Sequence, residues 1–192
     1  MNLIESAFAT DPTLKQEMLG NDRDHWAGTV LEGYRRLDAK QKGAIGERIA
    51  DTVLATLGHT ITQRTSPGHD SIVDGIETEY KFSAACKDPK YNYLRQDRAM
   101  INHLSLDKDW ERCIYTVINI SEDKLERVSP EHIRPLFYWF SKEDFRRSIA
   151  AGTGRGHAFS PQQGGKKGGN DDYMSSLKRL KENGILRPIS EW

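Results

Sequence analysis

The chain has 192 residues, about the length of one domain, and its 28 Lys and Arg balance 28 Asp and Glu to a formal net charge of zero. This balance argues against a simple polycationic nucleic-acid binder, although a local basic patch is compatible with it. No stretch approaches the ~20 apolar residues of a membrane span, and the first residues lack the basic start and apolar run of a secretory signal. Two cysteines without a CxxC pair suit a reducing compartment, so we expect one cytoplasmic domain without a zinc framework.

The first part of the chain is expected to be helical. Residues 1–38 have apolar side chains at helical spacing, with breaks at Pro12 and near 20–22, and are predicted to form an N-terminal helical extension. Residues 40–57 predict a stronger helix that ends at Gly58. Its expected buried stripe consists of Ile45, Ile49, Val53, Leu54 and Leu57.

The hydrophobic period then changes to that of strands. Residues 59–65 alternate, and the short runs 69–73 and 76–83 are joined by Asp74-Gly75, a strong signal for a two-residue hairpin turn. After a loop at 84–93 we expect a helix at 94–104, a buried strand at 112–120 and a weaker strand region at 127–140. Ser141 and Asp144 indicate a capping box for a short helix to about residue 151, and a last helix is predicted at 173–182. This order predicts one α/β domain with a mixed central sheet flanked by helices.

The hairpin carries the most informative pattern. If Asp74-Gly75 is a two-residue turn, the register places Asp70 directly opposite Glu79, with Cβ atoms ~4.5–5.5 Å apart. Lys81 lies two residues beyond Glu79 and therefore points to the same side of the strand. Three charged groups then share one face, while the alternate residues at 76, 78, 80 and 82 are mostly apolar. The alternative is a solvated strand face on which Asp70 and Lys81 form a weak surface ion pair.

Two carboxylates this close repel each other, and a divalent cation would relieve the repulsion. Mg²⁺ suits such a site because it takes oxygen ligands and often shares them with a substrate phosphate. Asp70 and Glu79 are therefore candidate metal ligands, and Lys81 could hold the attacking water or neutralise developing negative charge. Glu47, on the 40–57 helix, is a candidate for a further acid. Asp74 is a rival for the first acid, but the turn would place it at the far end of the hairpin from Glu79.

The segments GAIGERIA and HDSIVDGIETEYKFS resemble the PD-(D/E)XK nuclease superfamily, whose pattern is a helix with a Glu, an Asp on one strand and Glu-x-Lys on the next. Asp70 matches the Asp, residues 79–81 match the Glu-x-Lys, and Glu47 matches the frequent helix acid. The resemblance covers residues 40–120 and implies the restriction-endonuclease-like αβββαβ core. It also implies phosphodiester hydrolysis that depends on Mg²⁺, one or two ions per site, with the two strand acids as metal ligands. The chain departs from the pattern where His69 precedes the Asp.

Two segments are candidates for contacts with DNA, through side chains that can pair with phosphates or base edges. In the first, the candidates are Tyr91, Tyr93, Arg95, Gln96 and Arg98. In the Gly-rich segment 152–170 they are Arg155, His157, Gln162, Gln163, Lys166 and Lys167. A solvated helix with core tyrosines and a disordered basic linker are the respective alternatives. Residues 146–192 hold nine Lys and Arg against four Asp and Glu, so this basic tail carries +5 and residues 1–145 carry −5.

The sequence therefore predicts a single nuclease domain over residues 1–192 that hydrolyses double-stranded DNA, as a type II restriction endonuclease. Cutting both strands with one site per chain implies either a homodimer or sequential nicking, and a restriction role is compatible with a cognate DNA methyltransferase in the same system. The alternatives are a repair, junction-resolving or phage DNA-processing nuclease, a catalytically silent DNA-binding module of the same fold, and a protein-interaction domain. The remaining histidines are interpreted as structural: His25, His59, His103 and His132. The large aromatic residues are interpreted as core or interface: Trp26, Trp110, Trp139 and Phe140.

Overall fold

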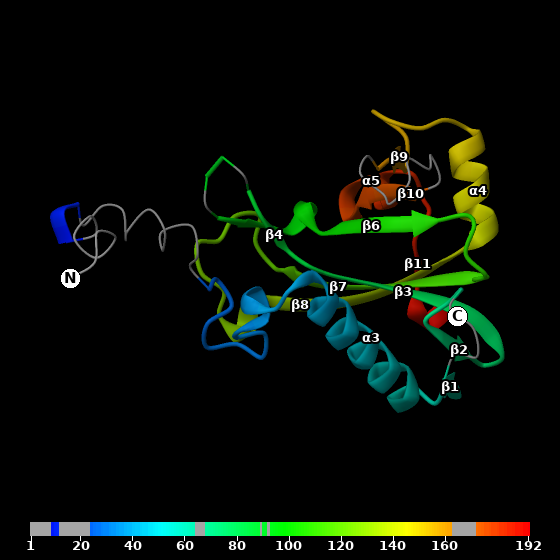
Figure 1. Ribbon diagram of the computed structural model, residues 1–192, viewed down its shortest axis with the longest axis horizontal. Coiled ribbons are helices and arrows are strands. Elements are labelled where there is room, and N and C mark those ends of the chain that lie inside the picture. Colours follow the sequence, from blue (N-terminus) through cyan, green and yellow to red (C-terminus); the bar gives the residue numbers. More distant parts are fainter. Residues whose placement is uncertain (1–8, 12–23, 64–67, 89, 92, 163–171) are drawn as a thin grey trace.

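A six-stranded mixed sheet in the order β1-β2-β3-β7-β8-β11 lies at the centre of the computed structural model, which describes residues 9–11, 24–63, 68–88, 90–91, 93–162 and 172–192 (Figure 1). Two smaller sheets have the orders β6-β10-β9 and β4-β5. The strands are β1 (Ile61–Gln63), β2 (Ser71–Val73), β3 (Ile76–Ala84), β4 (Cys86–Lys87), β5 (Leu94–Arg95), β6 (Met100–Ser105), β7 (Arg112–Ile120), β8 (Ile133–Ser141), β9 (Ser160–Pro161), β10 (Asp172–Ser176) and β11 (Arg187–Pro188). The helices are α3 (Ala39–Thr56), α4 (Lys142–Ala150) and α5 (Leu177–Glu182), with short 3-10 helices η1 (Tyr34–Arg36), η2 (Gln96–Arg98), η3 (Pro130–His132) and η4 (Ile189–Glu191).

The central sheet is covered on both faces (Figure 1). Side chains of β3 contact both covers. On one side lies α3, where the Tyr80 hydroxyl donates to the Asp51 carboxylate over 2.7 Å. On the other side lies β6, where the Met100 amide donates to Ser83 Oγ over 2.9 Å. The expected α/β fold with a mixed central sheet flanked by helices is confirmed.

The hairpin of β2 and β3 has the predicted turn and register. Asp74 and Gly75 have φ values of 52° and 80°, the positive values that a type I′ turn requires at both positions. The strands pair from the turn to Ser71 opposite Thr78, as the two-residue turn predicts. Local turn chemistry therefore fixes which residues of β3 share a face.

The helix predicted at 40–57 is confirmed as α3, but its buried face differs from the expected stripe. The residues that α3 buries are Gly46, Ala50 and Leu54. Ile45 and Leu57 of the expected stripe are 38% and 55% exposed. Two of the three buried residues are small because α3 packs very close to β3, whereas Ile45 and Leu57 lie on the exposed part of the helix.

The crossover between the parallel strands β3 and β7 is not the predicted helix. Residues 94–104 form β5, η2 and most of β6. β6 pairs with β10, which lies far along the chain. This long-range pairing overrides the local helical spacing, as strand formation is strongly context-dependent.

Both ends of the chain also differ from the prediction. The described residues 24–38 form turns and the single helix η1, because Gly28 and Gly33 adopt φ values of 79° and 81° that interrupt a longer helix. Residues 1–8 and 12–23 of the expected extension lie outside the described residues. The helix expected at 173–182 begins only at Leu177, after β10 and the N-cap Ser176.

Other predicted elements are confirmed. The strand at 112–120 is β7, the capping box of Ser141 and Asp144 precedes α4, and 127–140 contains η3 and most of β8. The large aromatic residues interpreted as core are at most 8% exposed: Trp26, Trp110, Trp139 and Phe140. Within the described ranges, no helix combines the length and apolar character that a membrane crossing needs.

The turn residue Asp74 connects the hairpin to two distant parts of the chain. Its carboxylate lies 2.7 Å from His59 Nδ1 and accepts the Thr60 N–H over 2.8 Å and the Trp192 Nε1–H over 3.2 Å. The hydrogen bond from Thr60, followed by that from His59, lowers the pKa of Asp74. A carboxylate with a lowered folded-state pKa stabilises the fold above its unfolded pKa, and this contribution is lost as the pH falls through the folded value.

The substitution Asp74→Asn is therefore expected to destabilise the protein in a pH-dependent way. Asn tolerates the left-handed turn, so the change removes the charge and keeps the backbone. We expect a loss of about 0.5–1 kcal/mol in the free energy of unfolding near neutral pH. Urea unfolding at several pH values should show the gap to the wild type closing below the ordinary Asp pKa of 3.8. If the difference in unfolding free energy between the variant and the wild type is the same at every pH, the effect comes from the turn backbone and not from the carboxylate charge.

Candidate active site

β3 continues beyond Thr78, where its pairing with β2 ends. There Asp70, the residue before β2, hydrogen-bonds to the β3 backbone in place of a strand residue. The ladder ends at Ser71 opposite Thr78, and the Asp70 amide donates to the Thr78 carbonyl over 3.0 Å. The Asp70 Oδ2 atom accepts the Tyr80 N–H over 2.8 Å. This hydrogen bond fixes the carboxylate beside the strand that carries Glu79 and Lys81.

Glu79 is a buried carboxylate that two ammonium groups share. Its side chain is 1% exposed, and its Oε1 accepts hydrogen bonds from Lys81 Nζ at 2.7 Å and Lys108 Nζ at 2.8 Å. Its other oxygen, Oε2, is buried and has no hydrogen-bond partner among the described residues. A buried carboxylate oxygen without a donor is costly, so this oxygen is the place where a cation would be bound most readily.

The charges of the cluster shift one another's protonation. Burial, followed by the nearby Glu79 carboxylate, raises the pKa of Asp70 above its ordinary value, although the Tyr80 amide and the two lysines oppose this. Burial alone would lower the pKa of Lys81, but the charge and hydrogen bond of Glu79, with other negative groups, raise it overall. The Lys81 ammonium therefore stays charged at neutral pH, while the two acids repel each other.

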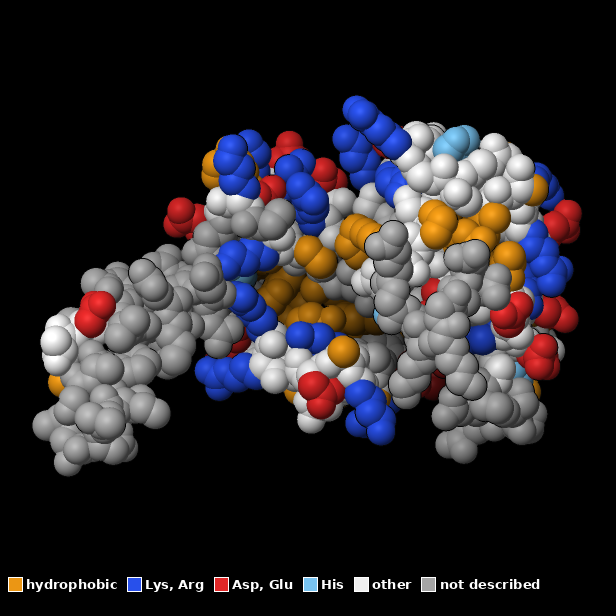
Figure 2. Space-filling model, turned by 45° about the horizontal axis from the view of Figure 1, so that its top comes forward, with side chains coloured by type: hydrophobic (Ala, Val, Ile, Leu, Met, Phe, Trp, Pro, Cys, Tyr) orange, Lys and Arg blue, Asp and Glu red, His pale blue; other side chains and the backbone are white. Residues whose placement is uncertain are grey.

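The cluster opens into a cleft of about 630 Å³ whose lining includes Asp70, Glu79, Lys81, Lys108 and Glu47. Glu47 comes from α3, as expected from the sequence. Figure 2 shows a hollow on this face with hydrophobic side chains on its floor and Lys and Arg side chains at its rim. The basic residues of the lining other than Lys81 and Lys108 are Arg35, Lys42 and Lys87. The cleft therefore brings together the carboxylates of the cluster and several Lys and Arg side chains.

Within the part of the chain that the structure describes, no group of three or more His, Cys, Asp and Glu side chains could by itself hold a metal ion. A cation at the cluster would therefore rest on the two carboxylates of Asp70 and Glu79, together with oxygens from water or a ligand. The rival acid Asp74 is bound to His59, Thr60 and Trp192 at the other end of the hairpin.

Lys108 is the member of the cluster that sequence reasoning missed. It lies between β6 and β7, outside the hairpin and the helix that carry the recognisable pattern. The segment around it, residues 106–109, has no residue spacing that indicates a catalytic or binding motif. The loop reaches Glu79 because the residues before it form the strand β6. With residues 94–104 expected as a helix, no signal in the sequence could place Lys108 at the site.

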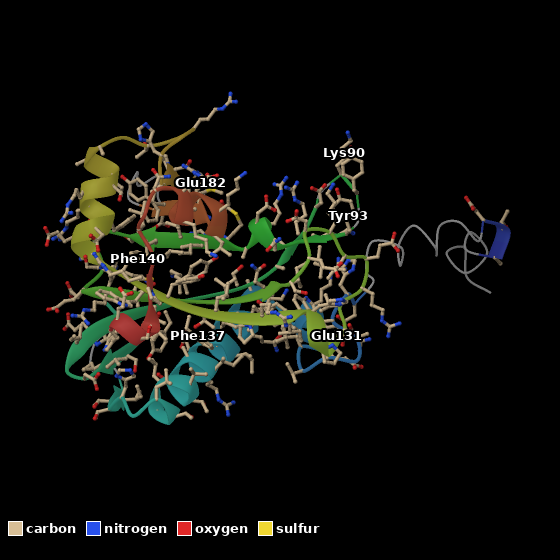
Figure 3. All side chains as sticks on the ribbon, turned by 180° about the vertical axis from the view of Figure 1, so that it is seen from behind. Lys90, Tyr93, Glu131, Phe137, Phe140 and Glu182 are labelled. Atoms are coloured by element: carbon tan, nitrogen blue, oxygen red, sulfur yellow. The ribbon has the colours of Figure 1, made fainter. Side chains whose placement is uncertain are left out.

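The first group of predicted DNA contacts is divided between two environments. Tyr91 and Tyr93 stack with ring centroids 5.6 Å apart, and Figure 3 shows Lys90 and Tyr93 on the projecting segment between β4 and β5. Arg95 donates to Asp97 in a two-point contact at 2.9 and 2.8 Å. Gln96 Nε2 donates to an Asp123 carboxylate oxygen, and Arg98 lies 3.7 Å from Asp88. Arg95 and Gln96 would therefore have to exchange partners to contact DNA, whereas Arg98 is 44% exposed.

The second group of predicted DNA contacts belongs to the Gly-rich segment 152–170. Arg155 is exposed, whereas His157 packs against Gly152, where an added Cβ would meet its ring at 2.5 Å. Arg179 of α5 donates to the carbonyls of Gly154 and His157, so the described residues 152–162 are packed and not a free linker. Three predicted contacts lie outside the described residues: Gln163, Lys166 and Lys167.

Gln162 is held at the cleft by His103, which was interpreted as structural from the sequence. The His103 amide donates to Gln162 Oε1 over 2.7 Å, and the Gln162 Nε2 lies 3.0 Å from His103 Nε2. His103 Nδ1 lies 3.2 Å from the Asp172 carboxylate, and its backbone has a φ of 52°. A strained non-glycine residue that lines the cleft is typical of a functional position.

No family model and no curated protein matches this chain. Among solved structures, the chain is similar to a bacterial homing endonuclease, I-Ssp6803I, at 17% sequence identity and a TM-score of 0.36. The likeness covers 57% of this chain and 69% of that chain. At this TM-score the likeness carries no argument about the site, which rests on its own residues.

Proposed function

We propose that the protein is a metal-dependent endonuclease that hydrolyses phosphodiester bonds of double-stranded DNA. The observation that carries the proposal is the buried Glu79 carboxylate, paired with Lys81 two residues along β3 and lying beside Asp70 at the edge of an open cleft. Two acids and a lysine at this spacing are the groups that the PD-(D/E)XK resemblance implies. A solvated strand face does not account for a carboxylate that is 1% exposed.

The residues of the cluster fit a divalent cation, and Mg²⁺ is the ion that we propose. Mg²⁺ is commonly bound through one or two carboxylates plus substrate phosphates, and Glu79 Oε2 is a buried oxygen without a hydrogen-bond partner. Asp70 and Glu79 would hold the ion. When bound, such an ion stabilises negative charge on a phosphoryl oxygen and orients water.

The chain's own residues supply positioning and charge. The Lys81 ammonium donates to Glu79 and is held at the cleft, where it can hydrogen-bond the attacking water or a phosphoryl oxygen. As the PD-(D/E)XK resemblance implies, the water oxygen would bond to phosphorus and give up a proton, while the bond to O3′ breaks and O3′ takes up a proton, so the products carry a 5′-phosphate and a 3′-hydroxyl. Glu47, on the cleft wall, is the proposed further acid.

The basic rim of the cleft supports DNA as the substrate. Arg35, Lys42 and Lys87 line the same cleft as the acids, and such cations bind phosphates in a salt-dependent manner. Gln162 and His103 at the other wall offer side chains that could contact bases. We propose sequence-specific cleavage of the type II restriction kind. The homodimer, the methyltransferase partner and the cytoplasmic location stay predictions.

Plasmid cleavage tests the proposal. Purified protein is expected to nick and linearise supercoiled plasmid with Mg²⁺ and to leave it intact with EDTA. Asp70→Asn should lower the cleavage rate at least about 10²-fold, because the ion loses one of its two carboxylates. Discrete fragments with ligatable ends would support sequence-specific cleavage.

The matched control is Glu143→Gln, which removes an exposed carboxylate on α4 and should cleave like the wild type. Cleavage that persists in EDTA, or wild-type rates from Asp70→Asn, would contradict the proposed site. A strong preference for branched DNA would assign the same chemistry to junction resolution. DNA binding without cleavage under any divalent ion would indicate the silent binding module.

A further inference from the structure

Lys108 shares the Glu79 oxygen with Lys81, although the two lysines are held very differently. The Lys81 side chain is 17% exposed and comes from the middle of β3, whereas the Lys108 side chain is 40% exposed and comes from the loop between β6 and β7. Both ammonium groups donate to the same atom, Glu79 Oε1. One of these two counter-ions is therefore fixed in the sheet, and the other faces the open cleft.

The backbone that carries Lys108 is anchored to the site on both sides. The Lys142 ammonium donates to the Lys108 carbonyl, and His69 Nδ1 lies 3.1 Å from the Asp109 carbonyl. Trp110, two residues on, is 1% exposed, and its Nε1–H donates to the Ser105 carbonyl over 2.9 Å. The Cα of Lys108 is thus held in place, while its long and flexible side chain can change partner.

Charge balance indicates when the side chain would change partner. In their ionised forms, Asp70 and Glu79 together with Lys81 and Lys108 sum to zero. A divalent cation bound between the acids raises this sum to +2, so it repels the ammonium groups at close range. The more exposed of the two has the open cleft to move into, and a DNA phosphate there carries the opposite charge.

We propose that Lys108 is an exchangeable counter-ion: it neutralises Glu79 in the metal-free protein and transfers to a phosphate of the DNA when a divalent ion binds. This inference rests on the proposed function of the site. It assigns to Lys108 two effects of opposite sign, since the side chain competes with the metal for Glu79 and assists the binding of DNA once the metal is present.

The first test is metal affinity, measured on DNA-free protein by the electron paramagnetic resonance signal of free Mn²⁺. Lys108→Met should bind Mn²⁺ roughly tenfold more tightly than the wild type, because a competing cation is removed. Lys108→Arg, which keeps the charge, should bind like the wild type. The control Lys178→Met removes an exposed lysine of α5 that lies 3.8 Å from Glu182 and is outside the cleft lining, and it should change Mn²⁺ affinity little.

The second test is the salt dependence of DNA binding, measured by fluorescence anisotropy of a labelled duplex. In Ca²⁺, Lys108→Met should reduce the slope of log affinity against log salt by about 0.9, the value of one phosphate contact. In EDTA the same variant should leave the slope unchanged, whereas a permanent phosphate contact would lower it in both conditions. Circular dichroism spectra verify that each variant is folded.

The outcomes separate this inference from the proposed function. Wild-type Mn²⁺ binding that is lost in Asp70→Asn but unchanged in Lys108→Met would overturn the exchange and leave the nuclease intact. Equal slope changes with and without Ca²⁺ would also overturn it. If neither the wild type nor Lys108→Met binds Mn²⁺, and plasmid stays uncut, the proposed metal site itself is wrong. Binding by Lys108→Met alone would support the exchange.

Discussion

Replacing Lys81 by methionine is expected to slow plasmid cleavage by about two to three orders of magnitude while the protein still folds and binds DNA. Methionine keeps the apolar stem of the side chain and removes the ammonium that lies 2.7 Å from Glu79 Oε1. Lys108 still donates to this oxygen at 2.8 Å, so the buried carboxylate keeps a counter-ion. We expect the cleavage rate to fall about 10²–10³-fold, the usual cost of losing one group that stabilises transition-state charge. Single-turnover cleavage with saturating protein and Mg²⁺ measures it.

Two controls make the loss interpretable. Arg48→Met removes one exposed cation from the outer side of α3, away from the cleft lining, and should cleave like the wild type. Anisotropy with a labelled duplex in Ca²⁺ should show that K81M binds DNA with little change, since one contact among many is lost. Cleavage by K81M at the wild-type rate would remove Lys81 from the reaction, and loss of binding in proportion to cleavage would make it a DNA contact.

Variants of the two lysines that contact Glu79 are expected to separate two functions of the site: the chemical step, and the binding of metal and phosphate. Loss of Lys81 is expected to act on the rate of the chemical step, because its ammonium is fixed at the acids by β3. Loss of Lys108 is expected to act on metal affinity and salt dependence, because its ammonium can leave. Under the proposed exchange, the site would be neutral without metal and would gain a phosphate ligand with it, and metal binding would then be coupled to DNA binding.

Local patterns were sufficient to predict the hairpin and its acids. A two-residue turn at Asp74-Gly75 has one register, and that register predicts Asp70 directly opposite Glu79. The observed ladder ends one pair earlier, and Asp70 hydrogen-bonds to the Thr78 carbonyl and the Tyr80 amide instead. The burial of Glu79 does not follow from this alternation, because its neighbours Thr78 and Tyr80 are buried as well. The helix at 40–57 has strong local signals, and Glu47 lies on it in the lining of the cleft, while its role as a further acid stays a prediction.

Long-range pairing explains what could not be predicted. The segment 94–104 has helical spacing, yet residues 100–105 become β6 because β10 pairs with them. Without that strand, neither the position of Lys108 nor the contact of His103 with Gln162 could be inferred. The same error made Arg95 and Gln96 look like a free face, whereas the structure pairs them with acids.

The short distance between α3 and β3 also could not be predicted from hydrophobic spacing. It leads to the second large expected effect, a loss of stability when Gly46 is replaced by alanine. A Cβ added at Gly46 would lie 2.2 Å from the Phe82 Cβ and 2.6 Å from its Cγ. Contacts this short require the helix or the strand to move. Phe82 itself is held by the Tyr34 ring, with centroids 5.6 Å apart, so its side chain has little freedom to yield.

Gly46→Ala is therefore expected to lower the free energy of unfolding by about 1–3 kcal/mol, the usual cost of overpacking a core. Gly43→Ala is the matched control on the same helix, because a Cβ at Gly43 meets nothing within 4 Å. That variant should gain up to about 1 kcal/mol from helix propensity alone. Urea unfolding of both variants measures the difference, which isolates packing because both substitutions have the same intrinsic helical gain.

The same pair of variants tests whether the position of α3 matters for the cleft. Glu47 follows Gly46 directly and lines the cleft with Asp70 and Glu79. An outward shift of α3 in G46A should move Glu47 away from them, so cleavage should fall even at temperatures where the variant is fully folded. If Gly46→Ala stabilises the protein as much as Gly43→Ala, α3 does not pack this closely on β3, and the helix acid loses its structural support.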